Sequence, residues 1–236
     1  MGTCDHGLLD NDTALDGLFE LRDGLLGGII RLGAARPGPR ATGRLAAAVG
    51  VLLQLSPDAF AADSEDRRSI VAALRAHAPA FPALSPGARR VLSKIVAGQP
   101  PSGRARLGAR LRAALHAEGP APFGGRIAAL FAAPAAEAEV RACERRCVAK
   151  IREDFADEDT WSDLCREGYG MGALAFLLVL EPMRVPAATL EGWRRKAARG
   201  LAQLRAEPDE ELEFHERYYA NLERVFLALL KRAAAG

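Results

Sequence analysis

Apolar side chains recur every three to four positions along most of the chain, which is the spacing of one face of an α-helix. The pattern is clearest near the C-terminus, where residues 212–230 carry a single apolar stripe after Pro208. The stripe consists of Leu212, His215, Tyr218, Tyr219, Leu222, Val225, Phe226, Leu229 and Leu230. We therefore expect a long final helix that packs across several others.

Two segments are apolar on nearly every side. The longest apolar runs are residues 45–53 and 171–180. Each is about half of the ~20 residues that a membrane-spanning helix needs. We therefore interpret both as buried core helices, with residues 41–55 forming a central one.

Capping residues and turn residues divide the rest of the chain into further helices. The first is expected to start at residues 10–12 and to run to about Gly33, although a glycine pair at 27–28 requires either close packing there or a break. Ser85 followed by Pro86 predicts an N-cap and a first helical position, and Thr160 with Asp163 resembles a capping box. Other helices are expected at residues 63–77, 135–155 and 186–201.

The fold class follows from this pattern and from the composition. Apolar residues make up 49% of the chain but aromatic residues only 6%, because Ala and Leu dominate and β-branched residues are sparse. These are helix formers, so we predict an all-α, multi-helix globular bundle. The glycine- and proline-rich residues 98–103 predict a boundary or hinge between two helical domains, 1–99 and 104–236.

Charge is distributed unevenly, although the formal net charge is only +2. Residues 1–21 contain five acids and no Lys or Arg, whereas residues 22–120 contain fifteen basic residues and six acids. A basic middle region attracts phosphate backbones or acidic protein surfaces. Frequent arginine in a GC-rich genome would give the same composition without any such function.

The N-terminal acids form the one cluster that helix packing does not fully explain. Asp10, Asn11 and Asp12 lie where the first helix should begin, and Asp16 continues its outer face. Helix capping accounts for part of this cluster. The remainder predicts either a recognition surface for a basic partner or a surface that neutralises the basic middle of the same molecule.

The same segment resembles an uncharacterised bacterial family of unknown function. Its members open with Met-Gly-x-Trp-Gly-x-Gly-x-Phe-(Asp/Glu)-Asn-Asp-x-Ala-x-Asp. The matching residues are Gly2, Gly7, Asp10, Asn11, Asp12, Ala14 and Asp16. The departures are Cys4, Asp5, Leu9 and Gly17. The resemblance covers at most the first hundred residues and implies a small helical domain, with no known activity.

A second candidate surface is a short predicted helix that carries four arginines. These are Arg104, Arg106, Arg110 and Arg112. They could hold phosphates, but no aromatic residue is interleaved with them to stack on bases. We therefore favour contact with another protein and keep nucleic-acid backbone binding as an alternative.

The sequence proposes no catalytic, metal or cofactor site. No phosphate-binding loop, dinucleotide fingerprint or zinc-protease motif occurs. Cys143 and Cys147 lie one helical turn apart on an apolar stripe, which favours core packing over metal binding. An enzyme site in the C-terminal half, around Glu211 and His215, stays an alternative.

These observations favour a non-enzymatic protein-binding module, of which a toxin-immunity or other defence-associated protein is the sharpest version. Four cysteines without a secretory signal indicate reduced thiols in a cytoplasm. The expected partner is another protein, reached through Asp10, Asn11, Asp12 and Asp16 and through the four arginines at 104–112. The sequence does not specify an oligomeric state.

Overall fold

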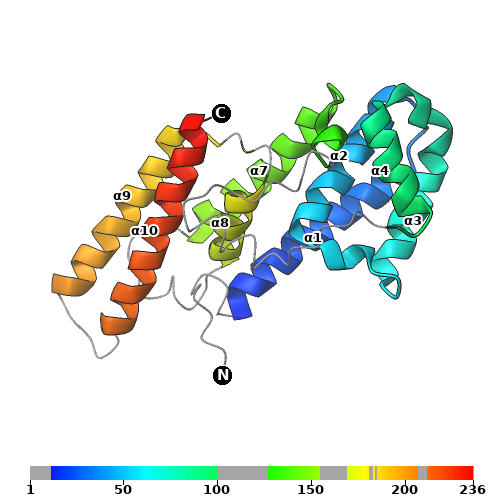
Figure 1. The fold of residues 1–236 in the computed structure, drawn as a ribbon. Coiled ribbons are helices and arrows are strands. Elements are labelled where there is room, and N and C mark those ends of the chain that lie inside the picture. The colour runs from blue at the N-terminus through cyan, green and yellow to red at the C-terminus, as the bar shows by residue number, and fades with distance from the viewer. Residues whose placement is uncertain are drawn as a thin grey trace.

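The computed structural model describes residues 12–99, 127–154, 169–180, 183, 185–206 and 212–235. These residues form eight α-helices and no strands, which confirms the predicted all-α fold (Figure 1). The helices are α1 (Asp12–Gly33), α2 (Pro39–Leu55), α3 (Glu65–His77), α4 (Pro86–Val96), α7 (Ala136–Asp154), α8 (Tyr169–Val179), α9 (Ala187–Ala206) and α10 (Leu212–Ala235). Short 3₁₀ turns η1 (Pro57–Phe60), η2 (Ala78–Ala83) and η3 (Ala129–Phe131) join some of them.

Four of the helices close into a unit in which each packs against two others. Helices α1 and α7 both pack against α2 on one side and against α8 on the other. Residues 171–179 of α8 and Leu180, which follows the helix, are all buried. Almost every residue from 42 to 55 of α2 is buried as well. Both segments are apolar nearly all round, so only a position covered by several helices removes them from water. The prediction of two core helices is confirmed.

Helix α1 is continuous through its glycines. A Cβ at Gly27 or Gly28 would meet only the side chain of Arg31, so no close packing explains the pair. The close approach lies instead at the end of the helix, where a Cβ on Gly33 would come within 2.4 Å of the Cβ of Ala73 in α3. The glycine pair therefore neither breaks α1 nor marks a tight contact.

A buried histidine ties together three of the helices. His77 at the end of α3 lies 2.9 Å through Nδ1 from the Thr42 hydroxyl of α2 and 2.9 Å through Nε2 from the Leu32 carbonyl of α1. The carbonyl can only accept, so Nε2 donates to it, while Nδ1 pairs with the hydroxyl. This histidine therefore links α1, α2 and α3 within the core.

Helices α9 and α10 form a hairpin that packs on the four-helix unit through α10 and α8 (Figure 1). The predicted stripe is confirmed for its central residues, because Tyr218, Leu222 and Phe226 are buried. Arg232 near the end of α10 donates to the carbonyls of Leu177, Leu178 and Leu180. It thereby satisfies the last carbonyls of α8, which have no partners within their own helix.

The helices of the two predicted domains share one apolar core. Helices α7 and α8 come from range 104–236, and they pack on α1 and α2 from range 1–99. Residues 100–103 of the predicted hinge lie outside the described residues, and Gly98 just before them has a φ of 81°. The division into two domains stays a prediction, as does the capping box at Thr160 and Asp163, which also lies outside them.

Candidate binding groove

A concave surface lies where α2 and α7 begin. It has a volume of about 830 Å³ and is open along one side. Helix α2, the end of η2 and the segment from 132 to the middle of α7 form its walls. Its lining residues are Pro39, Arg40, Arg44, Ala83, Leu84, Ser85, Ala132, Ala133, Pro134, Ala135, Ala138, Ala142 and Arg145. We call this surface the arginine groove.

The floor of the arginine groove is made of small side chains. Six of the lining residues are alanines. The backbones meet closely here, because a Cβ on Gly43 would lie 3.0 Å from that of Ala133, and one on Gly87 would lie 2.7 Å from that of Ala129. Small residues on both sides let the segments approach and leave a shallow apolar floor between the longer side chains of the walls.

Three arginines give the groove its charge. Arg44 donates to Glu139 at 2.6 Å, and that carboxylate is only 15% exposed. Arg40 and Arg145 are exposed, and neither forms a salt bridge with any carboxylate that the structure describes. Helix α2 begins with Gly38 and Pro39, without a side-chain cap or an acid in its first turn. The positive end of the α2 helix dipole therefore adds to the positive charge of Arg40 and Arg145.

The described lining of the groove offers groups for recognition. Among its described lining residues the only hydroxyl belongs to Ser85, which accepts from the Ala88 amide at 3.2 Å as the predicted N-cap of α4. The described lining contains no His, Cys, Asp or Glu to act as a nucleophile or base. Exposed guanidinium groups beside an apolar floor instead suit a carboxylate-bearing segment with small side chains.

Most of the contact residues that the sequence predicts lie outside the described residues. Asp10, Asn11, Arg104, Arg106, Arg110 and Arg112 lie outside the described residues, so their predicted role stays untested. Asp12 begins α1, and Asp16 is exposed on its outer face. Asp16 does not line the arginine groove.

The start of α1 carries apolar residues that differ in their burial. These are Leu15, Leu18, Phe19 and Leu21. Leu18 and Leu21 are buried, whereas Leu15 is 37% exposed and Phe19 is 53% exposed. At 100° per residue, Leu15 and Phe19 share a face that is turned away from the face of Leu18 and Leu21. Asp16 therefore lies beside two exposed apolar side chains.

The cysteine pair lies in the core, as its apolar stripe predicts. Cys143 and Cys147 are both free and buried between α7 and its neighbours. A hydrogen bond with Cys143, burial and the charge of Glu144 raise the pKa of the Cys147 thiol well above its usual value. The described residues contain no cluster of three or more His, Cys, Asp or Glu side chains that could hold a metal ion.

Sequence reasoning did not identify the arginine groove. Arg40 and Arg145 are separated by about a hundred positions, and they meet only because α2 and α7 pack together. The excess of arginine in residues 22–120 was a signal for Arg40 and Arg44. Nothing in the amphipathic pattern of α7 distinguishes Arg145 from a solvated arginine.

The described part of the chain also contains no helix long and apolar enough to cross a membrane. Comparison with protein-family models, with curated proteins and with solved structures found no match to this chain.

Proposed function

We propose that this chain is a protein-binding module whose arginine groove takes an acidic segment of a partner protein. The observation that carries the proposal is the pair Arg40 and Arg145, two exposed guanidinium groups that come from α2 and α7 and line one alanine-rich groove, without a described carboxylate to pair with them. Charge complementarity of this kind selects acidic partners and speeds their association.

The groove supports two kinds of contact with such a segment. Its volume of about 830 Å³ lies in the range of pockets that enclose a drug-sized ligand. The guanidinium groups of Arg40 and Arg145 would each form charge-assisted hydrogen bonds with a carboxylate, and Arg44 is held in place by Glu139. The alanine floor would accept small apolar side chains between these carboxylates.

A cytoplasmic toxin-immunity or defence-associated role is the specific version of this function. An immunity protein acts by covering an acidic or basic surface of its partner, and needs no catalytic group. Free buried thiols at Cys143 and Cys147 support a reducing compartment.

The start of α1 supports a second contact with the same partner. Exposed apolar side chains that adjoin charged ones are typical of interfaces. Leu15, Asp16 and Phe19 form such a surface. Replacing Asp10, Asp12 and Asp16 together by asparagine should weaken capture of the partner while leaving the melting temperature within a few degrees; unaltered capture would exclude the acids as a contact.

The groove itself is tested by charge reversal combined with site-specific cross-linking. A photoreactive amino acid in place of Ala138 should cross-link, in a nuclease-treated lysate of the source cells, to a partner peptide that carries several Asp or Glu residues. Arg40→Glu with Arg145→Glu should abolish this cross-link. The matched control is Arg75→Glu with Arg224→Glu, which makes the same charge change at exposed positions outside the groove.

Two outcomes would contradict the proposal. One is a cross-linked peptide without acidic residues. The other is equal cross-linking in the reversed groove and in the control, with both variants retaining the helical circular dichroism of the original chain.

A further inference from the structure

A second groove, also of about 830 Å³, lies along the outer face of α9 next to the last turn of α7. Its lining residues are Arg152, Ala188, Thr189, Gly192, Trp193, Arg195, Lys196, Ala198, Arg199 and Ala202. It shares no residue with the arginine groove, and we call it the α9 groove. Four of its side chains are cationic, and no described carboxylate lines it.

The charges of the α9 groove differ from those on the other face of the same helix. On the face toward α10, Arg194 donates to Glu223 at 2.7 Å and Arg205 donates to Glu216 at 2.7 Å. On the groove face, Arg195, Arg199 and Arg152 form no ion pair with any described residue. Like charges at adjacent turns of a helix repel one another, and an anion in the groove would relieve this repulsion.

Small residues leave space around these cations. The groove face of α9 also carries the small residues Ala188, Gly192 and Ala202. A Cβ on Gly192 would meet no atom within 4 Å. An anion can therefore approach the helix surface closely between the long side chains. The hydroxyl of Thr189 supplies a further hydrogen-bond donor at the same face.

We propose that the α9 groove binds a compact oligophosphate, such as the triphosphate group of a nucleotide or inorganic triphosphate. A triphosphate group carries several negative charges, and Arg152, Arg195 and Arg199 bring positive charge to this groove without a described carboxylate to pair with them. Arginine and lysine are the side chains that bind phosphate oxygens most commonly. The cavity volume lies within the range of sites for small ligands.

A compact ligand fits these residues better than a nucleic-acid strand. Three of the cations, Arg195, Lys196 and Arg199, lie within about one turn of a single helix. A strand would need a longer basic track with exposed aromatic side chains for its bases. Trp193 is the one aromatic residue in the described lining, and it is buried as part of the floor.

Isothermal titration calorimetry with inorganic triphosphate and with ATP, at low and at high salt, tests this proposal. Both ligands should bind the full chain, and Arg195→Ala with Arg199→Ala should weaken both by about tenfold or more. The matched control, Arg205→Ala with Arg224→Ala, removes two arginines from the same hairpin outside the groove and should leave both affinities unchanged. Equal affinity for the two ligands would assign recognition to the phosphates alone, and tighter binding of ATP would add a contact to the nucleoside.

Several outcomes would overturn the proposal. These are an absence of binding at millimolar ligand, an equal loss of affinity in the control, and binding of a single-stranded RNA oligonucleotide much more tightly than either triphosphate. The charge-reversed arginine groove variant, Arg40→Glu with Arg145→Glu, should still bind triphosphate. The two sites can therefore fail or succeed independently.

Discussion

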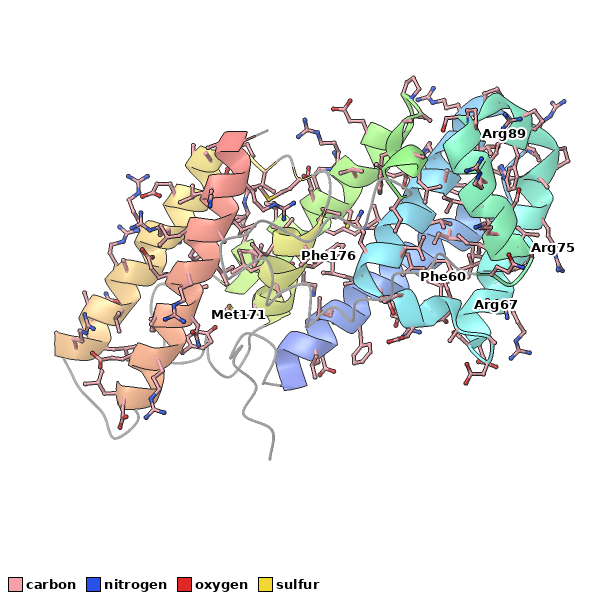
Figure 2. All side chains as sticks on the ribbon, in the orientation of Figure 1. Phe60, Arg67, Arg75, Arg89, Met171 and Phe176 are labelled. Carbon is pink, nitrogen blue, oxygen red and sulfur yellow. The ribbon has the colours of Figure 1, made fainter. Side chains whose placement is uncertain are left out.

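The closed four-helix unit and the α9–α10 hairpin are held in different ways. In the unit, α1, α2, α7 and α8 each pack against two of the others, and the buried faces are almost entirely apolar. The hairpin joins the unit through α10 and α8, and ion pairs connect its two helices to each other (Figure 1). Figure 2 shows Phe176 between the helices of the unit, and many of the side chains of α9 on its outer surface.

The two regions should therefore differ in local stability. Apolar burial is the main favourable contribution to folding, and it is concentrated in α2 and α8. The charged hairpin adds less apolar area to the unit, so it should open at a lower free energy than the unit as a whole. The α9 groove lies on this less tightly held part, and the arginine groove lies on the unit.

The largest expected effect comes from truncating the centre of the unit. Leu174 of α8 is fully buried, so Leu174→Ala should lower the free energy of unfolding by about 2–5 kcal/mol through lost burial and a residual cavity. Chemical denaturation followed by circular dichroism measures this. Leu227→Ala on α10 is the control, because that side chain is 48% exposed. A similar loss in both variants would contradict the assignment of the core to α8.

The second largest effect is expected when the contact between the hairpin and the unit is weakened. Arg232→Met keeps most of the apolar stem but leaves the carbonyls of Leu178 and Leu180 without this donor. A lost charged hydrogen bond of this type costs about 1.5–3 kcal/mol. Hydrogen exchange monitored by mass spectrometry should show weaker protection in α9 and α10, with α1 and α2 unchanged. Equal loss of protection throughout the chain would show that the hairpin and the unit open together.

The unit should also respond to alkaline pH through α7. The pKa of Cys147 is raised by its hydrogen bond with Cys143 and by burial, and that of Lys150 is raised chiefly by Glu20, 2.6 Å away in α1. A raised pKa means that the folded state favours the protonated form of the group. The contribution of that group to the free energy of unfolding is therefore complete below its unfolded-state pKa and is lost as pH rises above it. For Cys147 the loss should begin near pH 9, where an unfolded thiol ionises.

Denaturation midpoints between pH 8 and pH 10.5 test this dependence. The midpoint of the original chain should fall with pH, and Cys147→Ala should reduce the slope. The contribution of Lys150 should not affect this range, because it is lost only above the usual lysine pKa of 10.5. The same slope with and without the thiol would rule out Cys147 as its source.

Much of the fold could be predicted from local sequence patterns. The end of α1 at Gly33, the N-cap at Ser85 and the burial of residues 171–180 follow from capping chemistry and helical periodicity. The pairing of α1 with α8 did not follow, because about 150 positions separate the two helices and an apolar face does not specify its partner. Arg232 was not recognised as a cap, since its position resembles that of a solvated arginine.

The candidate sites were less predictable than the helices for the same reason. Helical periodicity assigns a residue to a face of its own helix, whereas a groove depends on which faces of different helices meet. Arg40 and Arg145 come together through the contact between α2 and α7, and Arg152 joins Arg195 at the α9 groove. The predicted cluster at 104–112 was instead local in sequence, and it lies outside the described residues.

The smallest expected effect concerns the ion pairs within the hairpin. Arg205 and Glu216 are both partly exposed, and an exposed pair of this kind contributes about 0–1 kcal/mol that falls as salt increases. A double-mutant cycle with Arg205→Gln and Glu216→Gln should therefore give a coupling energy in this range at low salt and close to zero at 1 M salt. A larger coupling that persists in salt would mean that charged contacts hold α9 on α10 as firmly as apolar burial holds the unit, and the distinction between the two regions would no longer stand. A small coupling energy would mean that the apolar stripe of α10 holds α9, and with it the α9 groove, in place. The Arg232 cap would then help to keep α10 on α8.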